Sequence, residues 1–242
     1  MSSEQITLLD LPSKDPCSTW SLNPWKTRLI LNFKGLDYKT EWTEYPDIKP
    51  KIEPHLPPNE TGTPYTIPTI KLGDGTWIMD SRKIAAAIEK LHPQPCLHMD
   101  SPYLPKVEEI LPKIFQNVIP FCYNRIPINL LNEASTQYWY TTRAERVGMP
   151  VQEFEKKHGG EAAYEGAEPH LRQMTELLKE TEGPFFMGTD VSYADFVWAA
   201  ALVFFERVDK GMYREILKRT GDEGPHKLLL DGCAPWLKRN DH

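Results

Sequence analysis

The residue in the clearest chemical setting is Ser21, which stands just before a segment typical of a helix start. In "SLNPWKTRLILNFKG" (residues 21–35), Asn23 suits the N-cap, and Pro24 suits the first helical position because its missing N–H costs no hydrogen bond there. The free N–H groups and the dipole of a helix start attract anions. A serine hydroxyl beside them predicts a site for a negatively charged group of a ligand.

A second candidate site is the Asp80-Ser81 dipeptide, which opens the segment "DSRKIAAAIEKL". Ordinary N-capping accounts for the dipeptide taken alone. As a binding site, Ser81 and the first-turn N–H groups would hold a carboxylate, while Asp80 would accept from an ammonium group. A ligand with an α-amino-acid end would satisfy both interactions.

A proline within an apolar strand is the third feature, at Ile67-Pro68. Proline donates no hydrogen bond to a sheet, so it belongs at a strand start or a sheet edge. Two interpretations remain open from the local residues. The bond is either an ordinary trans bond, which base rates favour, or a cis bond that turns the neighbouring backbone N–H and C=O outward beside Ser21.

Other kinds of site chemistry are poorly supported. The segment "HPQPCLH" (residues 92–98) matches no common zinc spacing, so we expect no metal. Cys17 has no CxxC partner for dithiol chemistry. Ser21 lies in no GxSxG elbow and has no evident His and acid partners, which argues against a hydrolase nucleophile.

Composition excludes further classes. The chain has 28 Lys+Arg against 34 Asp+Glu, a net charge of −6, which argues against nucleic acid and anionic membranes as partners. The longest apolar run, residues 196–205, is too short to span a bilayer. No secretory signal is visible at the start, and the four cysteines show no disulfide-framework spacing. We expect a cytoplasmic protein.

Strand and helix patterns alternate in the first ninety residues and then become helical. Asp74-Gly75 between two apolar runs is a strong hairpin signal. Pro112, inside a helical pattern, predicts a kink or break. Ser192 and Asp195 form a capping-box pattern at a second-part helix. We predict an α/β domain over residues 1–93 and an all-helical domain over 100–242. The expected strands are 6–11, 38–42, 67–72 and 77–79, and the expected first-part helices are 24–34 and 80–91.

This order of elements resembles the thioredoxin-like, glutathione-binding domain of the glutathione transferases, followed by their all-helical C-terminal domain. A serine four residues before the Trp25 of a "W-[KR]-x-R" pattern is similar to the serine-type classes. The stretches "NPWKTR" and "FKGLDYKTEW" are similar to the etherase-related branch, which contains bacterial lignin β-etherases and the fungal-specific class A.

The resemblance implies roles for these residues toward glutathione. Ser21 would donate its hydroxyl to the glutathione sulfur and stabilise the thiolate, with Asn23 assisting or replacing it. Ile67 would pair with the cysteinyl unit through its backbone, with Pro68 in cis. The other residues implied on the glutathione side are Asp80 and Ser81 at the γ-glutamyl end, His55 near the glycine carboxylate, and Trp25.

The resemblance also implies a pocket for the electrophile between the Ser21 loop and the first helices of the second domain. Aromatic residues there are more often core than pocket. Those that face the cleft would favour flat aromatic or polyphenolic compounds. The candidates are Trp20, Phe121, Tyr123 and Trp139.

Three hypotheses follow from the resemblance. The first is an enzyme that uses glutathione to attack aromatic electrophiles, cleave aryl ethers or remove a glutathionyl group. The second is a ligandin-type protein that sequesters aromatic or polyphenolic molecules with little turnover. The third, a structural or regulatory module, is least favoured because Ser21 is present. The family also implies a homodimer.

Overall fold

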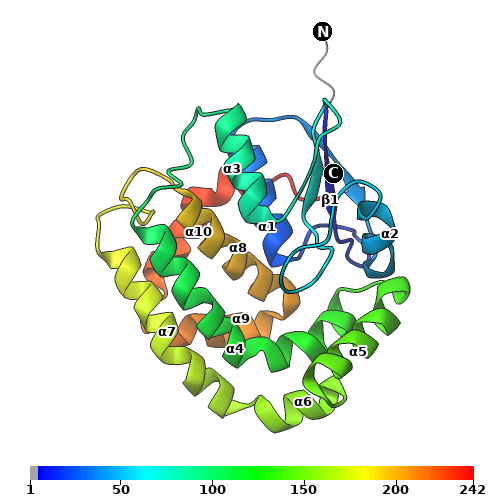
Figure 1. The fold of residues 1–242 in the computed structure, drawn as a ribbon. Helices are drawn as coiled ribbons and strands as arrows, with labels where there is room; N and C mark the ends of the chain where they lie inside the picture. Colours follow the sequence, from blue (N-terminus) through cyan, green and yellow to red (C-terminus); the bar gives the residue numbers. More distant parts are fainter. Residues whose placement is uncertain (1–4) are drawn as a thin grey trace.

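The computed structural model describes residues 5–242, shown in Figure 1. Its N-terminal part contains one four-stranded sheet in the order β2-β1-β3-β4. The two strands β1 and β2 pair in parallel, and the pairs β1–β3 and β3–β4 are antiparallel, so the predicted mixed sheet is confirmed. The strands are β1 (Ile6–Asp10), β2 (Tyr38–Trp42), β3 (Thr69–Lys71) and β4 (Trp77–Met79).

Burial explains why these strands hold their places. Every residue of β1 is buried, as a central strand requires, whereas β2 at the sheet edge alternates between inward and outward side chains from Tyr38 onward. In the register, Ile6 lies opposite Tyr38 and Leu8 lies opposite Ile70. The hairpin between β3 and β4 turns at Asp74 and Gly75, where Gly75 has a φ of 88°.

Short helical elements surround this sheet. The helix α1 connects β1 to β2 and packs against α3 on one side and against α8 and α10 of the second part on the other (Figure 1). It therefore forms the seam between the two parts of the chain. The elements are α1 (Leu22–Phe33), η1 (Tyr45–Asp47), α2 (Ile48–Ile52) and α3 (Ser81–Leu91).

The rest of the described chain is helical, as predicted. The apolar run at residues 196–205 lies in α8 and is almost wholly buried, and Ser192 and Asp195 form the predicted capping box at its start. The helices are α4 (Tyr103–Asn129), α5 (Glu133–Val147), α6 (Val151–His158), α7 (Glu161–Lys179), α8 (Tyr193–Val208), α9 (Lys210–Arg219) and α10 (Gly224–Leu237). The thioredoxin-like and all-helical fold classes are confirmed.

One local prediction was wrong, and of the kink or break predicted at Pro112 the break does not occur. The helix α1 begins at Leu22 with Ser21 as its N-cap, two residues earlier than Asn23 predicted. Pro24 thus occupies the third helical position, which it can do because no N–H of the first turn has a partner within the helix. The helix α4 runs through Pro112 without a break, because its packing against α7 and α8 outweighs one lost hydrogen bond.

The C-terminal end of the chain returns to the sheet. After α10 it passes beside α1 and ends near β1 (Figure 1). There the backbone carbonyl of Asn240 accepts a hydrogen bond of 2.8 Å from the backbone N–H of Thr19. No helix of residues 5–242 is both long and apolar enough to cross a membrane.

Candidate active site

A cleft of about 840 Å³ lies where the first turns of α1 and α3 meet the loop that precedes β3. Three segments distant in sequence form its walls, so the fold itself creates the cleft. Residues at the starts of two helices line it, and the dipole of a helix start favours anionic ligands. Its lining residues are Asn23, Lys26, Asn59, Glu60, Thr61, Thr63, Thr66, Ile67, Pro68, Asp80, Ser81, Arg82 and Lys83.

Ser21 is the N-cap of α1, half-buried and two residues before the cleft-lining Asn23. Its backbone carbonyl accepts from the N–H of Trp25 at 3.1 Å. Among the described residues, its side chain makes no capping hydrogen bond to α1. The hydroxyl is therefore not used to cap α1, although Ser21 itself does not line the cleft.

Asp80 is the N-cap of α3 and uses its carboxylate to hold that helix. One oxygen, Oδ1, accepts from the backbone N–H groups of Arg82 and Lys83 at 2.9 and 3.2 Å. The residue has a φ of 84°, a left-handed conformation that Asp and Asn tolerate better than other non-glycine residues. Within residues 5–242, Oδ2 is left without a hydrogen-bond partner and can accept from a ligand ammonium.

The Ile67-Pro68 bond is cis and lies in the wall of the cleft between the two helix starts. The carbonyl of Pro68 accepts from the backbone N–H of Asp80 at 3.2 Å, which ties this wall to the start of α3. The Thr69 hydroxyl donates to the Thr66 carbonyl at 2.8 Å and steadies the turn. The cleft thus brings together five predicted residues: Asn23, Ile67, Pro68, Asp80 and Ser81.

Charge in the cleft is mixed with a positive excess. Three cationic side chains and two acidic ones line it. Lys26 is half-buried on the first turn of α1, and burial lowers its pKa to about 8, against the opposing attraction of Glu108 and Asp80. A pKa of about 8 lies close to neutral pH, so a bound carboxylate, which favours the protonated form, can change the charge of Lys26 there.

Three of the residues predicted on the glutathione side do not line this cleft: Ser21, which lies two residues before the lining residue Asn23, and Trp25 and His55. The Trp25 side chain is only 2% exposed and belongs to the core. The His55 ring is exposed after α2 and stacks on Trp77, with ring centroids 4.2 Å apart.

The four aromatic residues predicted for the electrophile pocket are buried. Trp20 donates from Nε1 to the Pro12 carbonyl at 3.1 Å, and Trp139 donates from Nε1 to the Tyr123 carbonyl at 2.8 Å. Phe121 stacks on Tyr164 with ring centroids 4.7 Å apart. These hydrogen bonds and stacking contacts are those of a packed core, the interpretation that base rates favour.

Sequence reasoning missed the polar residues on the loop before β3 and the cations beside the helix starts. Asn59 closes the loop by donating from Nδ2 to the Thr63 carbonyl at 3.0 Å. The run "NETGT" of short polar residues was the available signal, but only the folded chain places it opposite α3. The missed lining residues are Lys26, Asn59, Glu60, Thr61, Thr63, Thr66, Arg82 and Lys83.

The described residues contain no group of three or more His, Cys, Asp or Glu side chains that could hold a metal ion. The cysteines Cys17, Cys96, Cys122 and Cys233 are free thiols. Burial raises the pKa of Cys122 to about 12, so this thiol stays protonated.

Comparison with known families agrees with this geometry. Residues 20–91 match the family model of the glutathione S-transferase N-terminal domain, and residues 107–236 match that of the C-terminal domain. The chain belongs to the glutathione S-transferase family. The predicted resemblance is thereby confirmed at the level of the family.

Individual relatives lie among fungal proteins. The chain is 27% identical to the glutathione S-transferase-like protein ustS of Aspergillus flavus, over 91% of this chain and 86% of that protein. Glutathione transferase GSTFuA3 of Phanerochaete chrysosporium superposes with a TM-score of 0.85 at 26% identity, covering 97% of this chain and 98% of its own. The transferase CsGST83044 of Ceriporiopsis subvermispora, solved in complex with glutathione, gives 0.79 at 27% identity, covering 96% and 99%.

Proposed function

We propose that this glutathione transferase binds glutathione in the cleft between α1 and α3 and activates its thiol with Ser21. One observation carries the proposal: the hydroxyl at the N-cap of α1 makes no capping bond among the described residues, beside a cleft shaped for an amino-acid end. A relative of similar fold has been solved with glutathione bound, which supports the same ligand here.

Glutathione carries two carboxylates, one ammonium group and a thiol, and the cleft offers a partner for each. The γ-glutamyl end lies at the start of α3, with its carboxylate on Ser81 and its ammonium on Oδ2 of Asp80. The cysteinyl backbone runs along Ile67. The glycine carboxylate lies toward the cations of the cleft, with His55 as the alternative partner from the exposed loop.

The chemical gain lies in the thiolate. A free cysteine thiol has a pKa of about 8.5 and is mostly protonated at neutral pH, whereas a helix N-terminus lowers such a pKa. Ser21 donates its hydroxyl to the sulfur, and the thiol proton passes to solvent. The sulfur then forms a bond to the electrophilic carbon while the leaving group departs with the bonding electrons.

Asn23 is the alternative activating residue. It lines the cleft on the first turn of α1 and is exposed, whereas Ser21 is half-buried. An amide N–H can donate to a thiolate as a hydroxyl does. The roles of the two residues are distinguished by comparing the transfer rates of the single variants Ser21→Ala and Asn23→Ala.

Aromatic compounds are the proposed electrophiles. Support comes from α5, which reaches the rim of the cleft where Nη2 of Arg146 donates to the Thr63 hydroxyl at 3.4 Å. On the same helix the 41%-exposed Tyr138 ring stacks on Tyr45, with centroids 6.1 Å apart. An exposed aromatic face on the helix that reaches the rim of the cleft favours flat substrates, including aryl ethers and glutathionylated phenols.

A ligandin-type protein that sequesters aromatic molecules is the alternative, because the same exposed face binds them without turnover. We further propose that the protein is cytoplasmic and forms a homodimer. Sedimentation of the purified chain tests the dimer, and a monomer at micromolar concentration would refute it.

The deciding experiment is calorimetric titration of glutathione into wild type and Ser21→Ala in two buffers of different ionisation enthalpy. Proton release on binding to wild type, much reduced in the variant, supports thiol activation by Ser21. Equal binding without proton release refutes that role and favours the ligandin alternative, which a panel of aryl electrophiles and phenolic dyes then tests. No binding of glutathione to wild type refutes the proposed function.

A further inference from the structure

The loop that carries Ser21, residues 11–21, is held by its own side chains. Ser13 Oγ accepts from the backbone N–H of Ser18 at 3.0 Å, and Nε1 of Trp20 donates to the Pro12 carbonyl at 3.1 Å. Trp20 is only 1% exposed and lies with its ring centroid 6.4 Å from that of Phe204 on α8. The loop therefore has a compact internal structure that rests on the helical part of the chain.

Contacts from the helical part hold the same loop from outside. Nη2 of Arg207, on the last turn of α8, donates to Ser18 Oγ at 2.8 Å and to Ser13 Oγ at 3.4 Å. Lys14 donates from its backbone N–H to the Leu130 carbonyl and from Nζ to the Ile128 carbonyl, both at 2.8 Å. These bonds come from α8, from α4 and from Leu130 directly after α4, and none of the residues that supply them lines the cleft.

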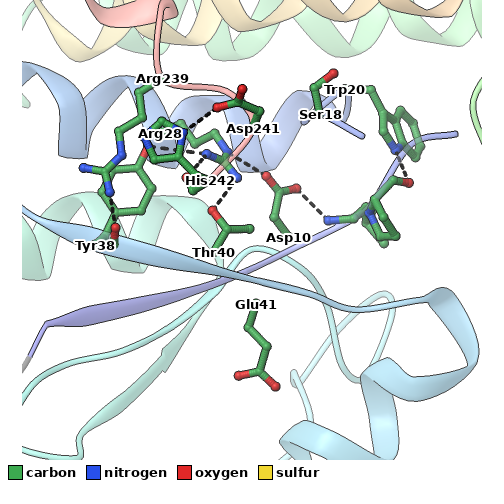
Figure 2. Close-up of polar contacts among 12 residues, drawn as sticks. Asp10, Ser18, Trp20, Arg28, Tyr38, Thr40, Glu41, Arg239, Asp241 and His242 are labelled. Atoms are coloured by element: carbon green, nitrogen blue, oxygen red, sulfur yellow. Dashed lines mark hydrogen bonds and ion pairs between the residues drawn. The ribbon is translucent and has the colours of Figure 1, made fainter. Parts of the chain in front are cut away.

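The C-terminal end supplies two further contacts, of which the one between Arg28 and His242 is drawn in Figure 2. Thr19, two residues before Ser21, donates from its backbone N–H to the Asn240 carbonyl at 2.8 Å. Nη1 of the fully buried Arg28 donates to the His242 carbonyl at 3.2 Å, while Nε pairs with Asp10 at 2.7 Å. Because Asp10 ends β1 and Arg28 lies on α1, this ion pair joins the two elements that flank the loop.

We propose that Arg207 is a positioning residue for Ser21, so that the helical part of the chain sets the place of the activating hydroxyl through Ser13 and Ser18. The inference rests on the proposed function of Ser21. Arg207 touches neither the cleft nor a reacting atom. Its effect would be indirect. A hydroxyl that stabilises a developing thiolate must be held in place before the reaction, because misplacement of a catalytic group lowers the rate.

Arg207 is well suited to this role because one planar guanidinium group bonds two hydroxyls of the loop at once. Ser13 and Ser18 are bonded to each other in turn, so the three residues form one unit. Arg207 is exposed, and its loss leaves no buried charge behind. The variant Arg207→Gln should therefore fold.

The test compares Arg207→Gln with Arg214→Gln, which removes the same charge from an exposed position on α9. For both, kcat and KM for a chlorodinitrobenzene electrophile and the pH at which bound glutathione ionises are measured, with the ultraviolet absorbance of the thiolate as the signal. We expect Arg207→Gln to lower kcat about fivefold with KM for glutathione nearly unchanged, well short of the hundredfold that a full misplacement costs. The ionisation of bound glutathione should move to higher pH, and Arg214→Gln should change neither quantity.

Two further variants separate positioning from a purely structural role. Ser18→Ala should reproduce most of the loss of kcat, because it removes the shorter of the two bonds that Arg207 makes to the loop. The double variant Ser18→Ala/Arg207→Gln should lose little more than Arg207→Gln alone, because that variant already lacks the bond to Ser18. Arg207→Lys should restore part of the rate. A lower thermal midpoint with unchanged kcat and unchanged thiol ionisation would overturn the proposal.

The outcomes distinguish this proposal from the one on which it rests. If wild type shows no acidified thiol on bound glutathione, or Ser21→Ala leaves the rate intact, the proposed function of Ser21 fails. If wild type acidifies the thiol and Ser21→Ala abolishes this, while Arg207→Gln and Ser18→Ala both behave as wild type, only the positioning role of Arg207 is refuted.

Discussion

Two helix starts face the same cleft, and they are built differently. At α3 the Asp80 carboxylate accepts from two backbone N–H groups of its own helix. At α1 the Ser21 side chain makes no capping bond among the described residues. An N-cap side chain normally satisfies the free donors that follow it and thereby stabilises the helix. The start of α3 meets this need internally, whereas the start of α1 keeps its donor capacity for a ligand.

The difference separates the residue proposed to bind glutathione from the residue proposed to activate its thiol. Asp80 caps α3 with one carboxylate oxygen and leaves the other without a partner among the described residues, so in the proposed function it serves both stability and recognition. Ser21 makes no cap bond, and in the proposed function its hydroxyl donates to the reacting sulfur. Substitutions at the two positions should therefore have different consequences, which the following measurements compare.

The largest effect should follow Ser21→Ala. We expect kcat for glutathione transfer to fall about 10²-fold, the loss typical of removing one donor to a developing negative charge. Stopped-flow or steady-state rates with a chlorodinitrobenzene electrophile measure it. Asn23→Ala is the matched variant on the same turn, and a large loss there with little loss in Ser21→Ala would transfer the activating role to Asn23.

A smaller effect should follow changes at Asp80. The variant Asp80→Asn keeps an N-cap oxygen and tolerates the positive φ but removes the negative charge that faces the ligand ammonium. Its affinity for glutathione should fall about tenfold, as the loss of a charged hydrogen bond predicts, while its thermal midpoint stays near that of wild type. Calorimetric titration and thermal unfolding test both parts; unchanged affinity would contradict the assignment of Asp80 to the ammonium.

Lys26 gives the start of α1 a pH dependence. Burial lowers the pKa of Lys26 to about 8 in the free protein, and a bound carboxylate favours the protonated form. Affinity should thus be highest below this pKa and decline a few-fold, by about 1 kcal/mol or less, as the pH rises through it. Titration with S-methylglutathione avoids any contribution from thiol ionisation. In Lys26→Gln, whose side chain does not titrate, most of the decline of affinity with pH should disappear.

The smallest effect should be on stability at Ser21. Without a cap bond to lose, Ser21→Ala should change the free energy of unfolding by less than about 0.5 kcal/mol. Asp80→Ala should cost about 2 kcal/mol or more, because the cap bonds to α3 disappear and alanine tolerates the φ of 84° poorly. Urea denaturation of the two variants makes the comparison. Equal losses would show that Ser21 supports α1 in a way that its hydrogen bonds do not reveal.

Sequence patterns predicted the fold well, because its signals are local. The hairpin at Asp74-Gly75 and the capping box at Ser192 each need only neighbouring residues to be recognised. The start of α1 was placed wrongly at Asn23 because a proline fits any position of a first turn, so Pro24 could not define the boundary.

The site was predicted in part, for a related physical reason. Asp80 and Ser81 are recognisable because a helix start carries its own chemistry, and Ile67-Pro68 because a proline in a strand is unusual. Phe121 and Trp139 are buried, and their apolar sequence context is the same for a core and for a pocket. Asn59 and Thr63 enter the cleft only through long-range folding of their loop, which no short pattern records.

The contacts that hold the Ser21 loop also have a consequence for biosynthesis. Ser21 leaves the ribosome long before Arg207 and Asn240, which contact its loop from far along the sequence. A nascent chain that has already completed the sheet and the first three α-helices still lacks these contacts. If Ser21 has the proposed role, its loop is held in place only after Arg207 and Asn240 have emerged and docked, and a ribosome stalled before that point carries the loop without these contacts.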